Sequence, residues 1–136
     1  MSKERFEIVV SEKLAATRCL SGFEGKLAVK HHHVYRLDYH LSAGDLNEYG
    51  ITCNFDEAKA VLADSIADLQ GAYLNEVEDV IAMSASKHVN PTGEVVARVV
   101  WNRAEKALAE KGLGVKVEMI IVAESPSGKV FYRKED

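Results

Sequence analysis

The sequence predicts an α+β domain with the element order ββααββ, in which two helices cover one face of a four-stranded antiparallel sheet. Two stretches rich in β-branched residues precede position 42, two apolar stripes at helical spacing lie between positions 54 and 111, and two further β-rich stretches follow position 114. With 136 residues the chain has the size of one domain, so we expect a single domain over residues 1–136.

The first two strands are expected in the N-terminal third of the chain. Residues 5–14 mix β-branched and charged side chains without a helical stripe, which predicts a strand that continues toward Cys19. Turn-forming residues follow at 21–25, and a long second strand is predicted over 27–41 before residues 42–45 end it. The two strands are natural antiparallel partners.

The first helix is predicted to begin at Phe55, with Asn54 as its N-cap and Gly71 beyond its end. Its apolar positions recur at helical spacing, namely Ala58, Val61, Leu62, Ile66 and Leu69. The stretch 70–89 is less regular, and four of its residues are expected to be buried anchors: Leu74, Val77, Val80 and Ile81.

The second helix is predicted to open at residues 90–94, because asparagine or threonine can cap a helix and proline suits its first turn. Gly112 and Gly114 end it. Residues 115–124 then form the third strand, and a turn at 125–128 leads into a fourth strand over 129–133. Such a sheet has open edges, which favours closure by oligomerisation.

The bulk properties exclude several classes of partner. Seventeen basic residues against 21 acidic ones give a net charge of −4, and no long basic cluster occurs, so nucleic acid is not an expected partner. The longest apolar run, 119–123, is too short for a membrane span. Two cysteines far apart in the chain, Cys19 and Cys53, fit reduced thiols, so we expect a soluble, cytoplasmic protein.

A histidine triplet, 31–33, lies within the predicted second strand. If this segment is extended, His31 and His33 share one face roughly 6.5 to 7 Å apart, while His32 points to the other face. Two imidazoles at this spacing can reach one divalent ion, although a catalytic zinc site usually takes three protein ligands. The alternative is a pair of partly buried polar side chains with hydrogen-bond partners.

The order of several short motifs resembles the 6-pyruvoyltetrahydropterin synthase family, which includes bacterial 6-carboxytetrahydropterin synthases. Residues 14–18 and 31–35 stand in the places of the family's Phe-x-Ala-Ala-His-Arg and His-Gly-His-x-Tyr patterns, and residues 90–94 resemble its Asn-Pro-Thr-x-Glu helix start. Weaker similarities lie at 50–55, 74–75, 122–124 and 130–132. The resemblance implies the tunnelling fold, in which ββααββ subunits join edge to edge into a barrel, as a trimer or hexamer.

The resemblance also assigns ligand-binding residues. It implies that Glu124 accepts hydrogen bonds from a pterin-like or purine-like heterocycle, a task that suits the two oxygens of a carboxylate. Thr92 and Glu94 are further candidate contacts with this substrate, although helix capping alone explains residues of these types at a helix start.

For the metal, the resemblance implies a zinc site made by His31, His33 and a third histidine. It places Thr17 at the third-ligand position. A neutral hydroxyl is a poor zinc ligand beside imidazole, so zinc binding is expected to be weakened or lost. His40 lies nine residues beyond His31 and therefore faces the other side of the strand.

The family's proton-transfer groups have no direct counterparts in this chain. The family uses a Cys, or in one branch a Glu, shortly before its His-Gly-His motif; the nearest ionisable substitutes here are Cys19 and Glu24, and His88 could approach from a loop. The family's Asp-His relay falls at residues 70–71, which are Gln and Gly. Three hypotheses follow: a divergent lyase-type enzyme, a heterocycle-binding protein without lyase chemistry, and a structural oligomer.

Overall fold

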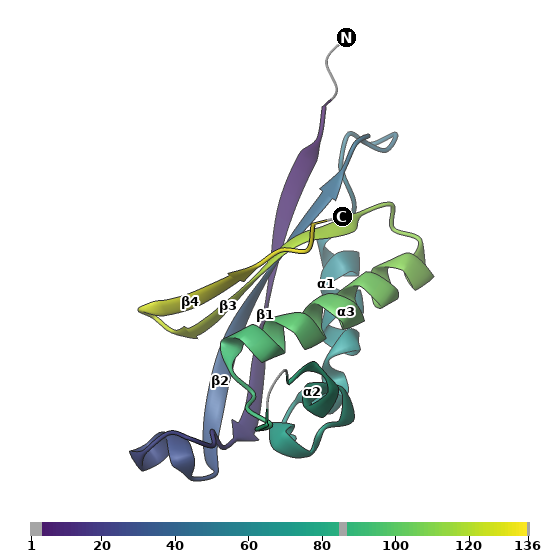
Figure 1. Ribbon diagram of the computed structural model, residues 1–136. Helices are drawn as coiled ribbons and strands as arrows, with labels where there is room; N and C mark the ends of the chain where they lie inside the picture. Colours follow the sequence, from purple (N-terminus) through teal and green to yellow (C-terminus); the bar gives the residue numbers. More distant parts are fainter. Residues whose placement is uncertain (1–3, 85–86, 136) are drawn as a thin grey trace.

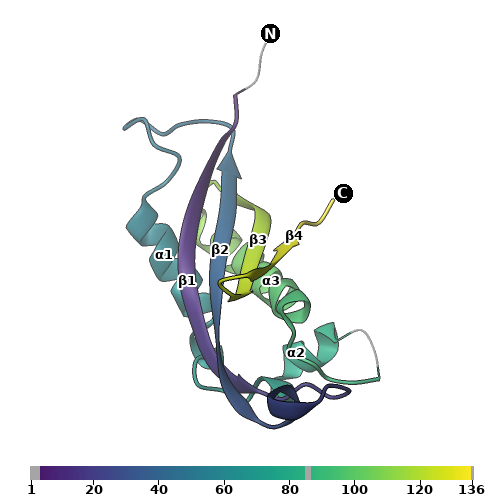
Figure 2. The ribbon, with the colours of Figure 1, turned by 90° about the vertical axis from the view of Figure 1, so that its left-hand side faces the viewer.

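The computed structural model describes residues 4–84 and 87–135 of the chain. Within them the sheet has four antiparallel strands in the order β1-β2-β3-β4, and the helices lie on one side of it (Figures 1 and 2). This arrangement confirms the predicted α+β class and element order. The strands are β1 (Phe6–Arg18), β2 (His31–Ala43), β3 (Lys116–Ser125) and β4 (Gly128–Tyr132).

The two principal helices begin where the sequence predicts. Helix α1 (Phe55–Ser65) is capped by Asn54, whose side chain accepts the Glu57 N–H, and it packs against β1. Helix α3 (Gly93–Lys111) packs against β3 and β4, and the Thr92 hydroxyl accepts the Val95 N–H at its start. Helix α3 ends at Gly112, whose φ of 63° is readily adopted only by glycine.

Two boundaries differ from the prediction. Strand β2 begins at His31 instead of residue 27, because residues Gly25–Ala28 form a 3₁₀ turn after the positive φ of Gly25. Helix α1 ends at Ser65, whose hydroxyl donates to the Leu62 carbonyl, and only a 3₁₀ turn, Ala67–Leu69, follows.

The stretch predicted to be irregular contains a further short helix, α2 (Glu78–Met83). Val80 is buried as expected, but Ile81 is 46% exposed, so the prediction of a buried Ile81 is wrong. Successive helical residues are turned by about 100° around the axis. When Val80 points into the core, its neighbour Ile81 therefore points away from it.

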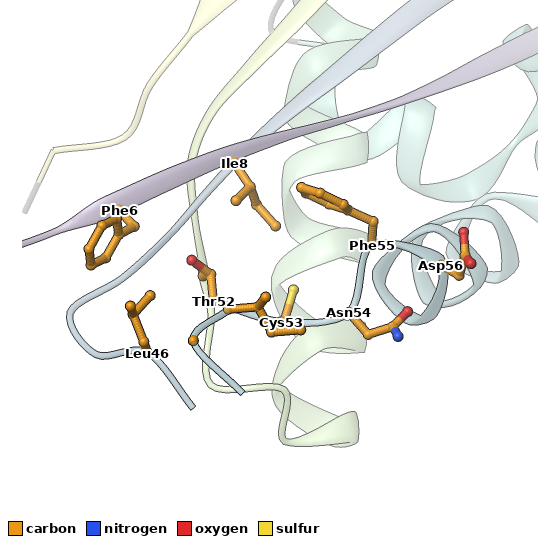
Figure 3. A pocket seen from close by; sticks show the side chains of 10 residues that line it. Phe6, Ile8, Leu46, Thr52, Cys53, Asn54, Phe55 and Asp56 are labelled. Atoms are coloured by element: carbon orange, nitrogen blue, oxygen red, sulfur yellow. The ribbon is translucent and has the colours of Figure 1, made fainter. Parts of the chain in front are cut away.

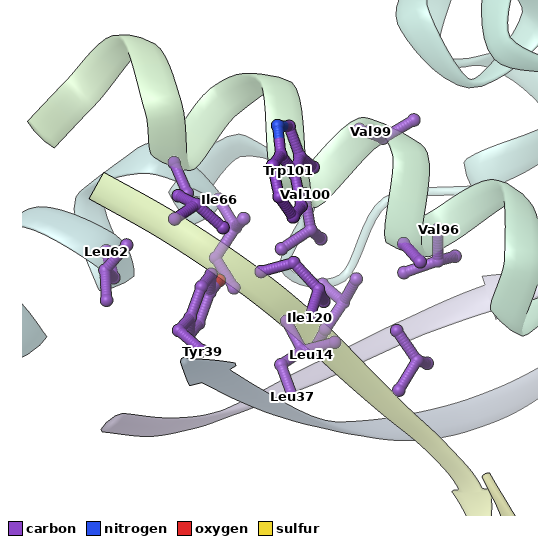
Figure 4. Close-up of a cluster of buried hydrophobic side chains, with 14 of the residues drawn as sticks. Leu14, Leu37, Tyr39, Leu62, Ile66, Val96, Val99, Val100, Trp101 and Ile120 are labelled. Atoms are coloured by element: carbon purple, nitrogen blue, oxygen red, sulfur yellow. The ribbon is translucent and has the colours of Figure 1, made fainter. Parts of the chain in front are cut away.

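The hydrophobic core lies between the sheet and the helices (Figure 4). The inward residues of the strands, such as Leu14, Leu37 and Tyr39, meet Val100 and Trp101 of α3. On β1 the inward positions alternate as strand geometry requires, and this inward row ends at the buried Arg18. The core therefore holds the C-terminal end of β1 in a fixed orientation.

Part of the β1 edge is already paired within the subunit. The Gly71 N–H donates to the Ala15 carbonyl and the Thr17 N–H donates to the Ala72 carbonyl, at 2.8 and 2.9 Å. The expectation of open sheet edges therefore does not hold at this end of β1. Among residues 4–84 and 87–135, no helix is both long and apolar enough to cross a membrane.

Candidate functional site

The candidate site lies where β1 ends and β2 begins. The antiparallel register pairs Arg18 with His31 and Ala16 with His33. Residues that face each other across two antiparallel strands point to the same side of the sheet. Arg18, His31 and His33 therefore share the helix-covered face, and the two imidazole centroids lie 6.1 Å apart. The prediction that the two histidines share a face is confirmed.

Arg18 is the central residue of this site. Its side chain is only 3% exposed, and its Nη1 donates to Glu124 Oε1 at 2.6 Å. The same nitrogen lies 3.1 Å from both the Tyr35 hydroxyl and the Pro91 carbonyl. A guanidinium this deeply buried needs an anionic partner, and Glu124 supplies it. Arg18 thus joins strands β1, β2 and β3 to the residues before α3.

His31 directs a lone pair toward this guanidinium. Its Nδ1 lies 2.8 Å from the Val29 carbonyl. Because a carbonyl oxygen only accepts, Nδ1 carries the proton and Nε2 is left with its lone pair. That Nε2 accepts a long hydrogen bond, 3.4 Å, from Nε of Arg18. The imidazole is therefore oriented by one hydrogen bond on each side.

His33 is held as a neutral ring beside the ion pair. Its Nε2 is buried, accepts or donates no hydrogen bond among the residues that the structure describes, and lies 3.6 Å from Glu124 Oε1. Burial lowers the pKa of His33, and the nearby positive charge of Arg18 lowers it further. The ring packs edge-on against Tyr35 at a centroid distance of 4.6 Å.

Glu124 lies at the end of β3, next to an irregularity in the pairing with β4, and its side chain is 29% exposed. It can lie against the first turn of α3 because position 93 is glycine: a Cβ there would come within 3.1 Å of Glu124 Cγ. Only Oε1 is engaged by Arg18, and within the described ranges Oε2 has no hydrogen bond. One oxygen is thus fixed and the other is available to a ligand.

A cavity of about 620 Å³ borders Glu124 on the side of the sheet away from the helices. Besides Glu124 its lining includes Val34, Arg36, Ala123 and Lys129, from β2 and the β3–β4 hairpin. This volume lies within the range of small-molecule sites. Because the Glu124 carboxylate bonds to Arg18 on the helix-covered face, this cavity meets Glu124 from the opposite side of the sheet.

The structure places Thr17, the residue predicted at the third-ligand position, on the other face of the sheet from His31 and His33. Thr17 pairs with His32, so it lies on the opposite face from His31, and its hydroxyl donates to the Ala72 carbonyl. Arg18 stands at that position instead. A one-residue shift along a strand moves every side chain to the other face. The alternation Leu14, Ala16, Arg18 along β1 indicates from the sequence that Arg18, and not Thr17, faces the core.

The residues present do not fit a zinc ion. Among the described residues, no three His, Cys, Asp or Glu side chains are placed to hold a metal together. The group beside His31 is a guanidinium, which has no lone pair to offer and carries a permanent positive charge. His40 lies on the other face, where its Nδ1 is 3.5 Å from Glu7, so it cannot complete the set.

The candidate catalytic residues are placed as follows. Cys19 is partly exposed and its thiol lies 3.5 Å from the Ala28 carbonyl. Glu24 is exposed in the turn before β2, and His88 is exposed in the segment before α3. The side chain of Gln70 bonds to the backbone of β1, because Oε1 accepts the Ala15 N–H and Nε2 donates to the Lys13 carbonyl. Gln70 therefore anchors a strand.

A second cavity, of about 530 Å³, lies at the opposite end of the sheet, where β1 begins (Figure 3). Its walls are mostly apolar and include Phe6, Ile8, Leu46 and Phe55, with Cys53 between them. Burial raises the pKa of the Cys53 thiol, which keeps it protonated. The lining of this cavity includes none of Arg18, His31, His33 and Glu124, so it is separate from the candidate site.

Comparison with known proteins agrees with the fold. A family model described as 6-pyruvoyl tetrahydropterin synthase matches residues 7–135. No curated protein sequence matches the chain significantly. The structure is similar to that of Caenorhabditis elegans 6-pyruvoyl tetrahydropterin synthase, with a TM-score of 0.76 and 13% identity over 99% of this chain and 100% of that one.

Two further solved structures are similar at low sequence identity. The Plasmodium vivax 6-pyruvoyl tetrahydropterin synthase gives a TM-score of 0.70 at 15% identity, over 98% of this chain and 99% of the other. An uncharacterized protein, WS1659 from Wolinella succinogenes, gives 0.64 at 14% identity, over 97% and 99%. At these identities the similarity is evidence for the fold.

Proposed function

Because the chain belongs to the 6-pyruvoyl tetrahydropterin synthase family, we propose that it binds a pterin-like or purine-like heterocycle at Glu124 and does so without zinc-dependent lyase chemistry. The observation that carries this proposal is the state of the Glu124 carboxylate. Arg18 fixes one of its oxygens, the other accepts no hydrogen bond among the described residues, and the side chain is 29% exposed. The anchor is thus oriented before any ligand arrives.

A flat heterocycle with adjacent N–H groups matches such a carboxylate. Each carboxylate oxygen has two acceptor sites, so the bond from Arg18 leaves capacity for two parallel N–H donors. Thr92 and Glu94 are secondary contacts in this proposal. The Thr92 hydroxyl already caps α3, and Glu94 is exposed in its first turn.

We propose no lyase chemistry because the residues at the proton-transfer positions either bond to the backbone or lie outside the group of side chains around Arg18. A positioned general acid or base contributes ~10²- to 10⁴-fold to a rate. Gln70 is engaged with the β1 backbone, and the residues around His31 do not fit zinc. An active enzyme would need Cys19, Glu24 or His88 as its base. The Cys19 thiol lies 3.5 Å from the Ala28 carbonyl, and Glu24 and His88 are exposed outside the group around Arg18.

Calorimetry tests the heterocycle proposal directly. We expect the protein to bind dihydroneopterin, pterin or guanine, and Glu124→Gln to weaken that binding at least tenfold, a loss of about 1.4 kcal/mol. The amide keeps an acceptor for Arg18 but turns an N–H donor toward the donors of the heterocycle. Glu110→Gln, at an exposed position near the end of α3, is the matched control.

Two results would overturn the proposal. One is wild-type protein that binds none of the three compounds, and the other is equal binding by wild type and Glu124→Gln. Steady turnover of dihydroneopterin triphosphate after zinc loading would instead support the divergent-enzyme hypothesis.

We further infer that the protein is a homo-oligomer, a trimer or hexamer. Large apolar side chains are exposed at two places on the surface. Leu46, Ile51 and Phe55 line the second cavity, and Phe131 lies on β4. Light scattering is expected to give three or six times the chain mass of 15.0 kDa. A mass equal to one chain at micromolar concentration would contradict this expectation and favour burial of these side chains by another partner.

The proposal places the protein in the cytoplasm. Cys19 and Cys53 are both free thiols, and reduced cysteines persist in that compartment.

A further inference from the structure

We propose that the guanidinium of Arg18 is a built-in cation that takes the position of a metal ion beside His31, His33 and Glu124 and keeps divalent metals out of this site. The proposal concerns the same site as the heterocycle proposal but does not depend on it. It rests on how the two imidazoles are oriented, on what lies between them and Glu124, and on the register of β1 against β2.

The imidazoles are arranged as metal ligands are. A metal-bound histidine usually donates its second ring N–H to a carbonyl or carboxylate, which orients the ring. His31 does this through Nδ1 and the Val29 carbonyl at 2.8 Å, so the lone pair of its Nε2 points into the site. The Nε2 of His33 is buried and has no hydrogen-bond partner within residues 4–84 and 87–135. Both rings thus turn a nitrogen toward the same region.

The occupant of that region is the guanidinium. Nε of Arg18 lies 3.4 Å from His31 Nε2, and Nη1 lies 2.6 Å from Glu124 Oε1. A guanidinium donates hydrogen bonds and accepts none, so it satisfies lone pairs that would otherwise coordinate a metal. Its charge persists at all physiological pH values, so Glu124 keeps a cationic partner without any bound ion.

The same geometry explains why a divalent metal is excluded. A metal bound to His31 Nε2 would have to approach the positive charge of Arg18 within a largely buried site, where like charges repel more strongly than in water. Catalytic zinc sites usually provide three protein ligands, and among the described residues no three His, Cys, Asp or Glu side chains are placed to hold a metal together. We therefore expect the residue at position 18 to determine whether this site holds the side chain's own positive charge or a bound metal ion.

A reversal experiment tests this inference. Arg18→His places a third imidazole directly across from His31 and on the same face as His33. We expect this variant to bind about one equivalent of Zn²⁺ in equilibrium dialysis and to give the intense visible absorption of tetrahedral Co²⁺. Its affinity should exceed that of wild type by more than roughly 100-fold, since changes in outer-shell partners alone alter metal affinity 10- to 100-fold.

Two further variants make the test specific. Arg18→His combined with His33→Ala should return to the wild-type affinity, which separates this site from surface histidines such as His32 and His40. Arg18→Gln removes the charge without adding an imidazole, and it should bind Zn²⁺ about tenfold more tightly than wild type, even if Arg18→His does not fold. Circular dichroism of each variant checks that it is folded.

The inference is overturned if wild-type protein binds Zn²⁺ as tightly as Arg18→His, or if a folded Arg18→His and Arg18→Gln both bind no better than wild type. Because the readout is metal content and a Co²⁺ spectrum, these outcomes are separate from those of the heterocycle calorimetry.

Discussion

Replacing Arg18 by methionine is expected to lower the free energy of unfolding by about 3 kcal/mol, since removal of one partner of a buried ion pair leaves the other charge uncompensated. Methionine fills a similar length of the site but donates no hydrogen bond. Glu124, which is 29% exposed, would lose its cation, and the Tyr35 hydroxyl and Pro91 carbonyl would each lose a donor. Denaturation by urea, followed by circular dichroism, measures the change.

Arg36→Met is the matched control on the same sheet. The Arg36 side chain is 62% exposed and its carboxylate partner, Asp38, is 3.9 Å away, so we expect a change within about 0.5 kcal/mol. The double variant Arg18→Met/Glu124→Gln should cost less than the sum of its two single substitutions, because it leaves no unpaired charge. Equal losses for Arg18→Met and Arg36→Met would show that the guanidinium does not hold this end of the sheet together.

The elements of the fold could be predicted because their signals are local. Asn54 and Thr92 cap the helices that follow them, and Gly112 ends α3 in a conformation that glycine favours. The start of β2 could not be predicted in this way. Apolar, β-favouring residues at 27–29 suggest a strand, whereas the structure places Gly25–Ala28 in a 3₁₀ turn. Here the closure of the β1–β2 loop, with a Leu20 N–H to Leu27 carbonyl bond, overrides local preference.

The candidate site was predictable only in part. Alternation along a strand correctly places His31 and His33 on one face, and the same rule applied to β1 places Arg18 on the face of Leu14. A family motif read without this rule points to Thr17 and misses Arg18. The partner of Arg18 could not be found from local patterns at all, because Glu124 is 106 residues away and only the packing of β3 brings it near.

Asn75→Asp is expected to lower the free energy of unfolding by about 3 kcal/mol, because it would leave two backbone carbonyls facing a new negative charge. The Asn75 side chain joins the end of β1 to the segment before α3. Its Oδ1 accepts the Cys19 N–H at 2.9 Å, and its Nδ2 donates to the carbonyls of Cys19 and Val89 at 2.7 and 3.0 Å. A carboxylate keeps the acceptor and loses both donors.

The same substitution at Asn47 provides the control. Asn47 uses only its oxygen in the described structure, accepting the N–H groups of Tyr49 and Ile51, and a carboxylate preserves both bonds. We expect Asn47→Asp to change stability by less than about 0.5 kcal/mol in the same urea titration. Cys19 directly follows Arg18, so Asn75→Asp should also make the position of the Arg18 guanidinium less fixed and weaken heterocycle binding. Asn47→Asp should leave heterocycle binding unchanged. If both variants bind equally well, Arg18 is held by its own contacts with Glu124 and Tyr35 alone.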